Sequence, residues 1–135
     1  MPLKLTLKPE EKVVINGAVL SNGPSKTTLS IENSAIILRQ KDIMQEEEAN
    51  TPARRIYFCI QMAYLDLENT NLYLEKTNQL VRDFMAAIPT EAVKKIIEPL
   101  GAELAGGRYF QALKRCRELI AFEEQRLNYG FESVR

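Results

Sequence analysis

The stretch TPARRIYFCIQMAYLD, residues 51–66, marks a change from one kind of structure to another. Thr51 followed by Pro52 is a typical helix start, because threonine caps free backbone N–H groups and proline is tolerated in the first turn. From Ile56 to Leu65 the apolar residues fall on almost every side of a helix instead of forming one stripe. We therefore expect a helix that is buried on most sides and lies centrally among its neighbours.

Upstream of this helix, residues 1–45 carry the pattern of short β-strands. Apolar and polar residues alternate with a period of two over residues 3–7 and 27–31. Residues 12–20 are β-branched and apolar, interrupted by Asn16-Gly17, which predicts a tight turn or, alternatively, a bulge within one longer strand. The other expected features are a turn at Pro9-Glu10-Glu11, a loop at Ser21–Ser25, a strand at Ala35–Arg39 and a short last strand at Lys41–Met44.

Downstream, residues 46–135 carry the pattern of helices, beginning with a polar linker at Glu46–Asn50. Thr90 should cap a third helix, and Pro99 should break or kink it. The helices after the first are expected over residues 70–88, 90–105 and 108–128. The sequence therefore predicts an α+β protein, with an N-terminal small antiparallel β module of four to five strands (1–45) packed on a C-terminal bundle of about four helices (46–135).

The composition argues against an enzyme. Histidine is absent, which excludes Ser-His and Cys-His nucleophiles and histidine-ligated metal sites. Carboxylates occur in runs at Glu10-Glu11, Glu46-Glu47-Glu48 and Glu123-Glu124, and such runs are usually solvated faces. Cys59 and Cys116 lie in apolar helical contexts and are expected to be reduced, buried thiols. We expect no catalytic residue, no metal and no cofactor.

Two absences give the expected location. No apolar stretch approaches the roughly 20 residues that cross a bilayer, so no membrane association is expected. The segment that begins at Met1 lacks the apolar core of a signal peptide. The cytoplasm is therefore the expected compartment.

Charge patterning carries the functional signal, because the 18 basic and 18 acidic residues leave no net charge overall. Residues 1–45 contain six Lys or Arg and four Asp or Glu, and no aromatic residue for stacking nucleic-acid bases. Lys4 and Lys8 share one face of the first strand, and Arg39 and Lys41 share a face of the last. If those strands are neighbours, the four cations form one strip that suits phosphates; plain solubility is the alternative. On the fourth helix Arg108, Gln111 and Arg115 share one face, which is either an ordinary solvated helix face or a phosphate-binding site.

Four segments resemble the FlbT family of flagellin-synthesis regulators of alphaproteobacteria. They are Leu5–Pro9, Val13–Val19, Leu38–Met44 and, most specifically, Ala49–Phe58. The resemblance covers the whole chain. It implies a regulator that acts after transcription at the 5′ untranslated region of flagellin mRNA, usually as a repressor that promotes message decay, opposite a partner called FlaF. Some members are reported as activators.

Residues 3–44 are also similar, more weakly, to carbon storage regulators, which are small β dimers that clamp RNA loops with backbone groups and few basic side chains. Thr6 and Lys8 match part of that family's RNA edge, and Arg39 matches its key arginine. Glu10 stands where both families usually have glycine, and a turn with positive φ would strain a glutamate.

Together these features predict binding to the flagellin mRNA leader. The expected RNA-binding residues are Lys4, Thr6, Lys8, Arg39 and Lys41, with Arg54 and Arg55 as a second set. The rival hypothesis is a protein-interaction adaptor whose helices bind flagellin, FlaF or another regulator, with Tyr109, Phe110, Tyr129 and Phe131 as candidate anchors. A homodimer is one way to cover so small a sheet.

Overall fold

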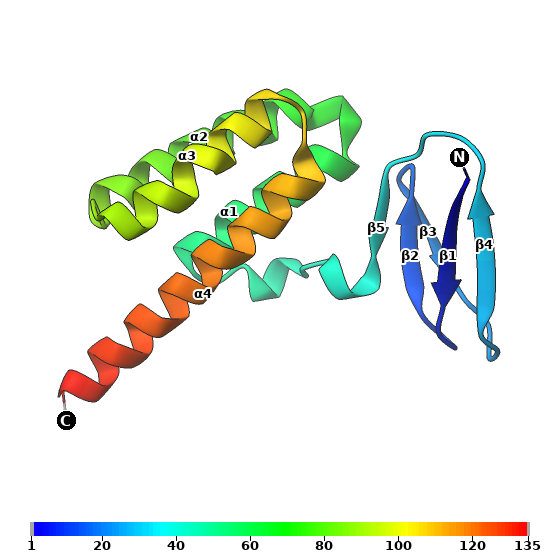
Figure 1. Ribbon diagram of the computed structural model, residues 1–135, viewed down its shortest axis with the longest axis horizontal. Coiled ribbons are helices and arrows are strands. Elements are labelled where there is room, and N and C mark those ends of the chain that lie inside the picture. Colours follow the sequence, from blue (N-terminus) through cyan, green and yellow to red (C-terminus); the bar gives the residue numbers. More distant parts are fainter. Residues whose placement is uncertain (1, 135) are drawn as a thin grey trace. The chain divides into compact units, whose positions relative to one another are not determined.

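Five strands come first along the chain and four α-helices follow them (Figure 1). The computed structural model describes the backbone of residues 2–134 and the side chains of residues 2–127. The strands are β1 (Leu3–Leu7), β2 (Lys12–Ile15), β3 (Ala18–Ser21), β4 (Thr27–Ile31) and β5 (Ile37–Arg39). The α-helices are α1 (Pro52–Leu65), α2 (Thr70–Ala87), α3 (Glu91–Ala105) and α4 (Tyr109–Val134). The predicted α+β class is confirmed.

The chain divides into two units, Met1–Ile43 and Met44–Arg135. The first holds all five strands and is called the strand unit below. The second holds the four α-helices and is called the helical unit. The division falls close to the change of sequence pattern near residue 45.

The strand unit contains two antiparallel sheets that share one apolar core. One sheet pairs β1 with β4, and the other has the order β3-β2-β5. Leu5 and Leu7 from the first sheet and Val13 from the second are buried together. The period-two alternation explains this burial, because alternate residues of a strand point to the same side of the sheet.

The β2–β3 connection is the tight turn that Asn16-Gly17 predicts. Asn16 has φ 50° and Gly17 has φ 82°, so both turn residues are left-handed, as a two-residue hairpin of this type requires. The alternative of a bulge within one longer strand is therefore wrong. Glu10 also adopts a left-handed conformation, with φ 65°, so the turn keeps a geometry that favours glycine.

The prediction of a short last strand over Lys41–Met44 is wrong, because the chain forms a 3₁₀ helix over Gln40–Asp42. The side-chain Oε1 of Gln40 accepts the backbone N–H of Lys12 at 2.7 Å. The backbone N–H of Lys12 in β2 is thus bonded to a side chain and not to a further strand residue, and the pairing of β2 with β5 ends at Arg39. β5 also begins later than predicted, at Ile37.

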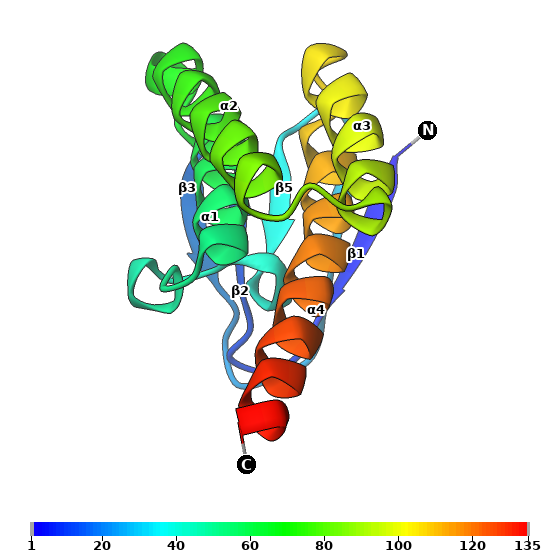
Figure 2. The same ribbon diagram turned by 90° about the vertical axis from the view of Figure 1, so that its left-hand side faces the viewer.

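In the helical unit α1 packs against both α2 and α4, and α3 packs against α4 (Figure 2). Thr51 caps α1 by accepting the backbone N–H of Arg54, and Pro52 occupies the first turn. Ile56 and Ile60 of α1 are fully buried, which confirms the central position that its apolar sequence predicts. Leu100 of α3 and Leu119 of α4 are buried as well.

Pro99 does not break the third helix, because α3 continues from Glu91 to Ala105. A proline inside a helix removes the bond to the carbonyl four residues earlier. That carbonyl belongs to Lys95, which is an exposed residue. The missing hydrogen bond therefore does not leave an unpaired group within the core. α4 also extends beyond the predicted end near residue 128, to Val134.

Among the predicted solvated carboxylates, Glu123 is instead buried and Glu11 is ion-paired within the strand unit. Glu123 is only 7% exposed, and its Oε2 accepts the backbone N–H of Ala53 at 2.9 Å. Glu11 forms an ion pair with Arg39 at 3.1 Å. In both cases a backbone or guanidinium donor compensates the loss of water.

Both cysteines are free thiols. Cys116 is fully buried, and Cys59 is half-buried. Burial raises the pKa of each thiol, which keeps it protonated and unreactive at neutral pH. No helix among the described residues has the combination of length and apolarity needed to cross a membrane.

Candidate nucleic-acid interface

The outward side of the β1–β4 sheet carries lysines and hydroxyl groups. On β1 the leucines at 5 and 7 are buried, so Lys4 and Thr6 point the other way and are exposed. Pairing places Ser30 opposite Lys4 and Thr28 opposite Thr6. We call this surface the lysine face, and its members are Lys4, Thr6, Lys8, Lys26, Thr28 and Ser30.

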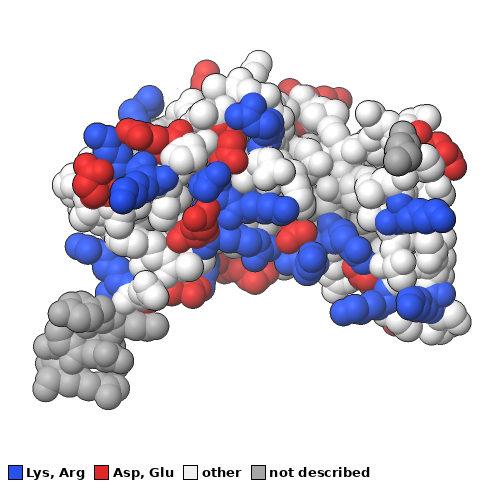
Figure 3. Space-filling model, in the orientation of Figure 1, with Lys and Arg blue, Asp and Glu red and all other residues white. Residues whose placement is uncertain are grey.

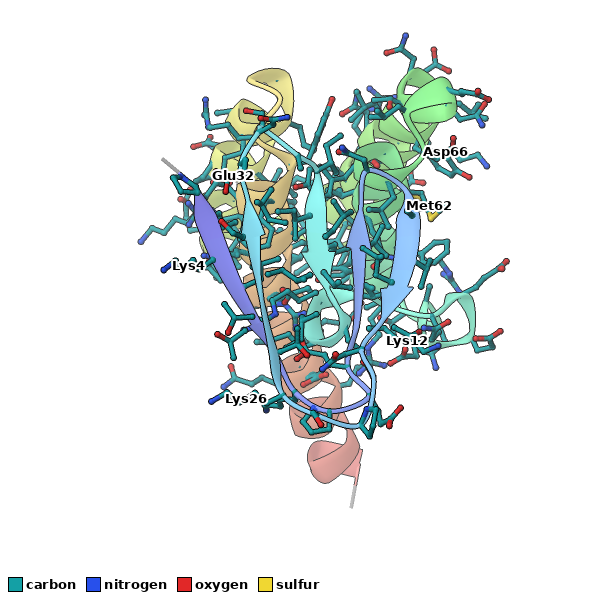
Figure 4. All side chains as sticks on the ribbon, turned by 90° about the vertical axis from the view of Figure 1, so that its right-hand side faces the viewer. Lys4, Lys12, Lys26, Glu32, Met62 and Asp66 are labelled. Carbon is teal, nitrogen blue, oxygen red and sulfur yellow. The ribbon has the colours of Figure 1, made fainter. Side chains whose placement is uncertain are left out.

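The lysine face concentrates positive charge. Lys8 directly follows β1 and Lys26 directly precedes β4, so both lysines lie at the same end of the sheet, just beyond the Leu7–Thr27 pair. Like charges at one end of a sheet repel each other, and an anion between them would relieve that repulsion. Glu32, whose carboxylate accepts the Ser30 hydroxyl at 3.1 Å, lies at the far end of β4. Figure 3 shows Lys and Arg spread over this side of the strand unit with acidic side chains at its margins, and Figure 4 shows Lys4 and Lys26 extending from the strands toward the same side.

A hollow of about 620 Å³ lies beside the lysine face in the same unit. Its lining residues are Lys8, Pro9, Glu10, Glu11, Arg39, Gln40 and Lys41. Three of the predicted RNA-binding cations, at positions 8, 39 and 41, thus meet at one place. The assumption behind that prediction is nevertheless wrong, because the hydrogen-bonded neighbour of β1 is β4 and not β5.

Arg39 is held in position by the strand unit itself. Its Nε and one terminal nitrogen bond the carboxylate of Glu11 at 3.1 to 3.3 Å, and the same nitrogen donates to the Thr6 carbonyl. The backbone N–H of Lys8, and then Arg39, hold the pKa of Glu11 below its ordinary value. Arg39 therefore brings little net charge to the hollow, and its predicted base contact stays a prediction.

The second predicted set, Arg54 and Arg55, belongs to the helical unit. Arg54 bonds the carboxylate of Glu124 at 2.8 Å and the side chain of Asn50 at 3.1 Å. Arg55 is exposed and lines a groove of about 970 Å³. The groove lies between the start of α1, the end of α2 and residues 123–127 of α4, and its walls are mainly apolar, including Leu80, Phe84 and Leu127.

The segment Ala49–Phe58 serves to join α1 to α4. Ala53 gives its N–H to Glu123, and its carbonyl accepts the thiol of Cys116 at 3.6 Å. Tyr57 accepts a hydrogen bond from Arg117 at 3.1 Å, and the guanidinium lies over its ring. Ala53 and Tyr57 of this segment therefore have a structural role in packing α1 against α4.

The other candidate groups on α4 are also engaged with their neighbours. Arg115 is bound by Glu103 and Glu118, and Lys114 lies over the Phe110 ring. Tyr109 is half-buried against Tyr64. The side chains of Tyr129 and Phe131 lie outside the described residues. These contacts favour the reading of this helix face as structural.

Three members of the lysine face were missed by the sequence reasoning: Lys26, Thr28 and Ser30. The alternation in residues 27–31 indicates a strand, and Lys26 stands two residues before Thr28 on the same side. What the sequence does not reveal is that this strand is the partner of β1. Among the described residues, no three His, Cys, Asp or Glu side chains gather to hold a metal ion.

Comparison with known proteins gives a consistent result. A family model described as "Flagellar protein FlbT" matches residues 3–127. The "Probable flagellum biosynthesis repressor protein FlbT" of Caulobacter sp. (strain K31) is 43% identical over 129 residues, which cover 96% of this chain and 98% of the relative. The "Flagellum biosynthesis repressor protein FlbT" of Caulobacter vibrioides (strain ATCC 19089 / CIP 103742 / CB 15) is 40% identical over 134 residues, 99% of this chain and 95% of the relative. No solved structure matches.

Proposed function

Since the chain belongs to the FlbT family of flagellar proteins, we propose that it is a cytoplasmic repressor of flagellum biosynthesis that acts by binding the 5′ untranslated region of flagellin mRNA. Binding would lower translation of the message or shorten its lifetime. The repressor role follows the names of the relatives. The observation that supports RNA as the ligand is the lysine face, where three lysines and three hydroxyl groups are exposed on one small sheet.

The chemistry of this face favours contacts to the RNA backbone. Lysines bind phosphates, and Thr and Ser hydroxyls can bond phosphate oxygens or 2′-hydroxyls. The strand unit has no aromatic residue on which a base could stack. Affinity should therefore come mainly from charge, and sequence preference from the adjacent hollow and from RNA shape. The similarity of residues 3–44 to carbon storage regulators stays a prediction.

The salt dependence of binding tests the lysine face. Each phosphate contact on a single strand contributes about 0.7 to the slope of log affinity against log salt, so replacing three lysines should reduce that slope by about 2. The variant is Lys4→Ala, Lys8→Ala, Lys26→Ala, and the measurement is a filter-binding titration with leader RNA between about 50 and 200 mM salt. The full chain is used throughout.

The matched control replaces three exposed lysines of the helical unit, at positions 76, 94 and 95. It carries the same change in net charge and should leave the salt slope close to that of the unaltered chain. An equal loss of slope in both triple variants would mean that only overall charge matters and would reject the lysine face.

Arg39 calls for a separate variant, because removing it also frees Glu11 from its ion pair. Arg39→Lys keeps the charge but loses the forked geometry that a paired base contact needs. If Arg39 reads a base, this variant should lose about 1–3 kcal/mol of affinity for the leader with the salt slope unchanged. Equal affinity would restrict Arg39 to holding the fold.

A second candidate function is a protein-interaction adaptor, favoured by the apolar groove of the helical unit. Binding of flagellin or FlaF there would make the effect on mRNA indirect. Leu127 is 59% exposed at the groove, so Leu127→Lys should abolish such binding without unfolding the chain. Titration calorimetry with each purified protein separates the two functions, since the lysine-face variant should leave this binding unchanged.

A further inference from the structure

Strand β3 is an apolar edge that is open to solvent. All four of its residues, Ala18–Ser21, are exposed, and β3 is the end strand of its sheet. Val19 is 67% exposed and Leu20 is 43% exposed. An edge of this kind offers unpaired backbone groups beside apolar side chains, and proteins normally cover or guard it.

The other edge strands of the strand unit are guarded by charge or by their short length. β1 contains Lys4, β4 lies between Lys26 and Glu32, and β5 is only three residues long. Charged side chains at an edge discourage pairing with another chain. β3 has no such residue, so among the described strands it is the one that is left ready to pair.

The backbone of β3 is in the right phase for pairing. The two-residue turn makes Ile15 and Ala18 a hydrogen-bonded pair, and alternation then makes Val13 and Leu20 the next one. The N–H of Asn22 donates to the Glu11 carbonyl at 2.8 Å, which continues the same alternation. The N–H and C=O groups of Val19 and Ser21 therefore point toward the free edge.

The charge of the surrounding segment identifies the occupant. Residues 13–25 contain no Asp, Glu, Lys or Arg and form the longest uncharged stretch of the chain, thirteen residues. A polyanion would meet no cation on this segment, since the nearest one along the chain, Lys12, stands on β2 opposite Ser21. A partner selected by its charge would find no opposite charge within residues 13–25. A second copy of the same segment, by contrast, meets it without repulsion, as a two-fold symmetric contact requires.

We propose that two copies of this chain associate through antiparallel pairing of β3 with β3, which joins their three-stranded sheets into one. In a register centred on Leu20, Val19 of each copy exchanges both backbone hydrogen bonds with Ser21 of the other. The two Leu20 side chains then face each other as a close, non-hydrogen-bonded pair. The inference is independent of the RNA proposal, because β3 carries no member of the lysine face.

The association is weak, since an edge of four residues buries far less than the roughly 1,200 Å² of a stable interface. It should therefore depend on protein concentration. Sedimentation equilibrium of the full chain is expected to show a mass between monomer and dimer that rises with concentration up to about 100 µM.

The decisive variant is Val19→Lys, which places a charge on the exposed edge and removes no buried side chain. The dissociation constant of the dimer should be at least tenfold higher for this variant than for the unaltered chain, because a lysine on an edge strand discourages pairing. The matched control is Thr28→Lys, which adds the same charge to an exposed position of β4 and should leave association unchanged.

A cross-link tests the register. In a Cys59→Ser background, Leu20→Cys should form an intermolecular disulfide under mild oxidation, because the two Cα atoms of such a pair lie about 4.5 Å apart. Thr28→Cys in the same background is the control and should not cross-link. A chain that stays monomeric at every concentration, or association that Val19→Lys leaves intact, or equal cross-linking by both cysteine variants, would overturn the proposal.

Discussion

The adjacent glutamates of α4 offer a sharp test of the helical unit, because one is buried and the other is exposed. Glu123 accepts the N–H of Ala53 at the start of α1, where the helix dipole also favours a negative charge. Glu124, whose side chain is 53% exposed, bonds Arg54 at 2.8 Å on the surface. We expect Glu123→Ala to destabilise the unit much more than Glu124→Ala.

The size of the difference follows from the contacts. Losing a charged hydrogen bond costs about 1.5–3 kcal/mol, and an orphaned buried N–H costs about 1–3 kcal/mol. Because these two terms overlap, about 3 kcal/mol is expected for Glu123→Ala. Glu124→Ala should cost about 0.5 kcal/mol, as exposed ion pairs do. Glu123→Gln keeps an acceptor oxygen and should lie between the two, near about 1 kcal/mol.

Thermal unfolding followed by far-ultraviolet circular dichroism measures this, since the α-helices dominate the signal. A loss of about 3 kcal/mol should lower the melting temperature by about 15 °C in a unit of this size. Equal melting temperatures for Glu123→Ala and Glu124→Ala would refute the reasoning, because they would mean that Glu123 does not hold the start of α1.

Three further outcomes are expected, each measured by urea unfolding. Glu10→Gly should stabilise the strand unit by about 0.5–1 kcal/mol. Glycine adopts φ 65° without the strain that a side chain causes, and this gain is larger than the cost of ordering glycine's more flexible unfolded backbone. The pKa of Glu11 is lower in the folded chain than its ordinary value of 4.5, so its contribution is complete above that value and is lost as the pH falls through the folded pKa. Glu11→Gln should therefore destabilise the strand unit at about pH 6, and this destabilisation should shrink progressively as the pH falls below 4.5, as followed by the NMR signals of its strands. Leu100→Ala should cost the helical unit about 3 kcal/mol, since this side chain is fully buried.

Local features of the fold could be predicted from the sequence because they depend on neighbouring residues. Alternation located β1 and β4, Asn16-Gly17 located the hairpin turn, and Thr51-Pro52 located the start of α1. Each of these rests on backbone preferences or side-chain periodicity within a few residues. The third helix was predicted, but Pro99 does not break it, because the cost of a proline within a helix depends on whether the affected carbonyl reaches solvent.

Strand order could not be predicted in the same way. The pairing of β1 with β4 depends on how two apolar faces meet across more than twenty residues of sequence, and any of the short strands offers such a face. Lys26, Thr28 and Ser30 were therefore left out of the candidate site. Glu123 did carry a signal, because it continues the inward stripe of Cys116 and Leu119 along α4.

The strand unit separates its charges so that two kinds of contact can be made by one small domain. The lysine face lies on and beside the β1–β4 sheet, while the uncharged segment, residues 13–25, contains β3, the edge strand of the other sheet. In that other sheet Lys12 stands on β2, inside the edge strand. A binder of polyanions that paired through a charged strand would have to place its own cations against those of the second copy, at an electrostatic cost. Moving the pairing edge to β3 removes that conflict.

If both proposals hold, the dimer carries two lysine faces. The salt slope of RNA binding by the unaltered chain at high protein concentration should therefore exceed that of Val19→Lys. Identical slopes would mean that a single copy makes all the phosphate contacts.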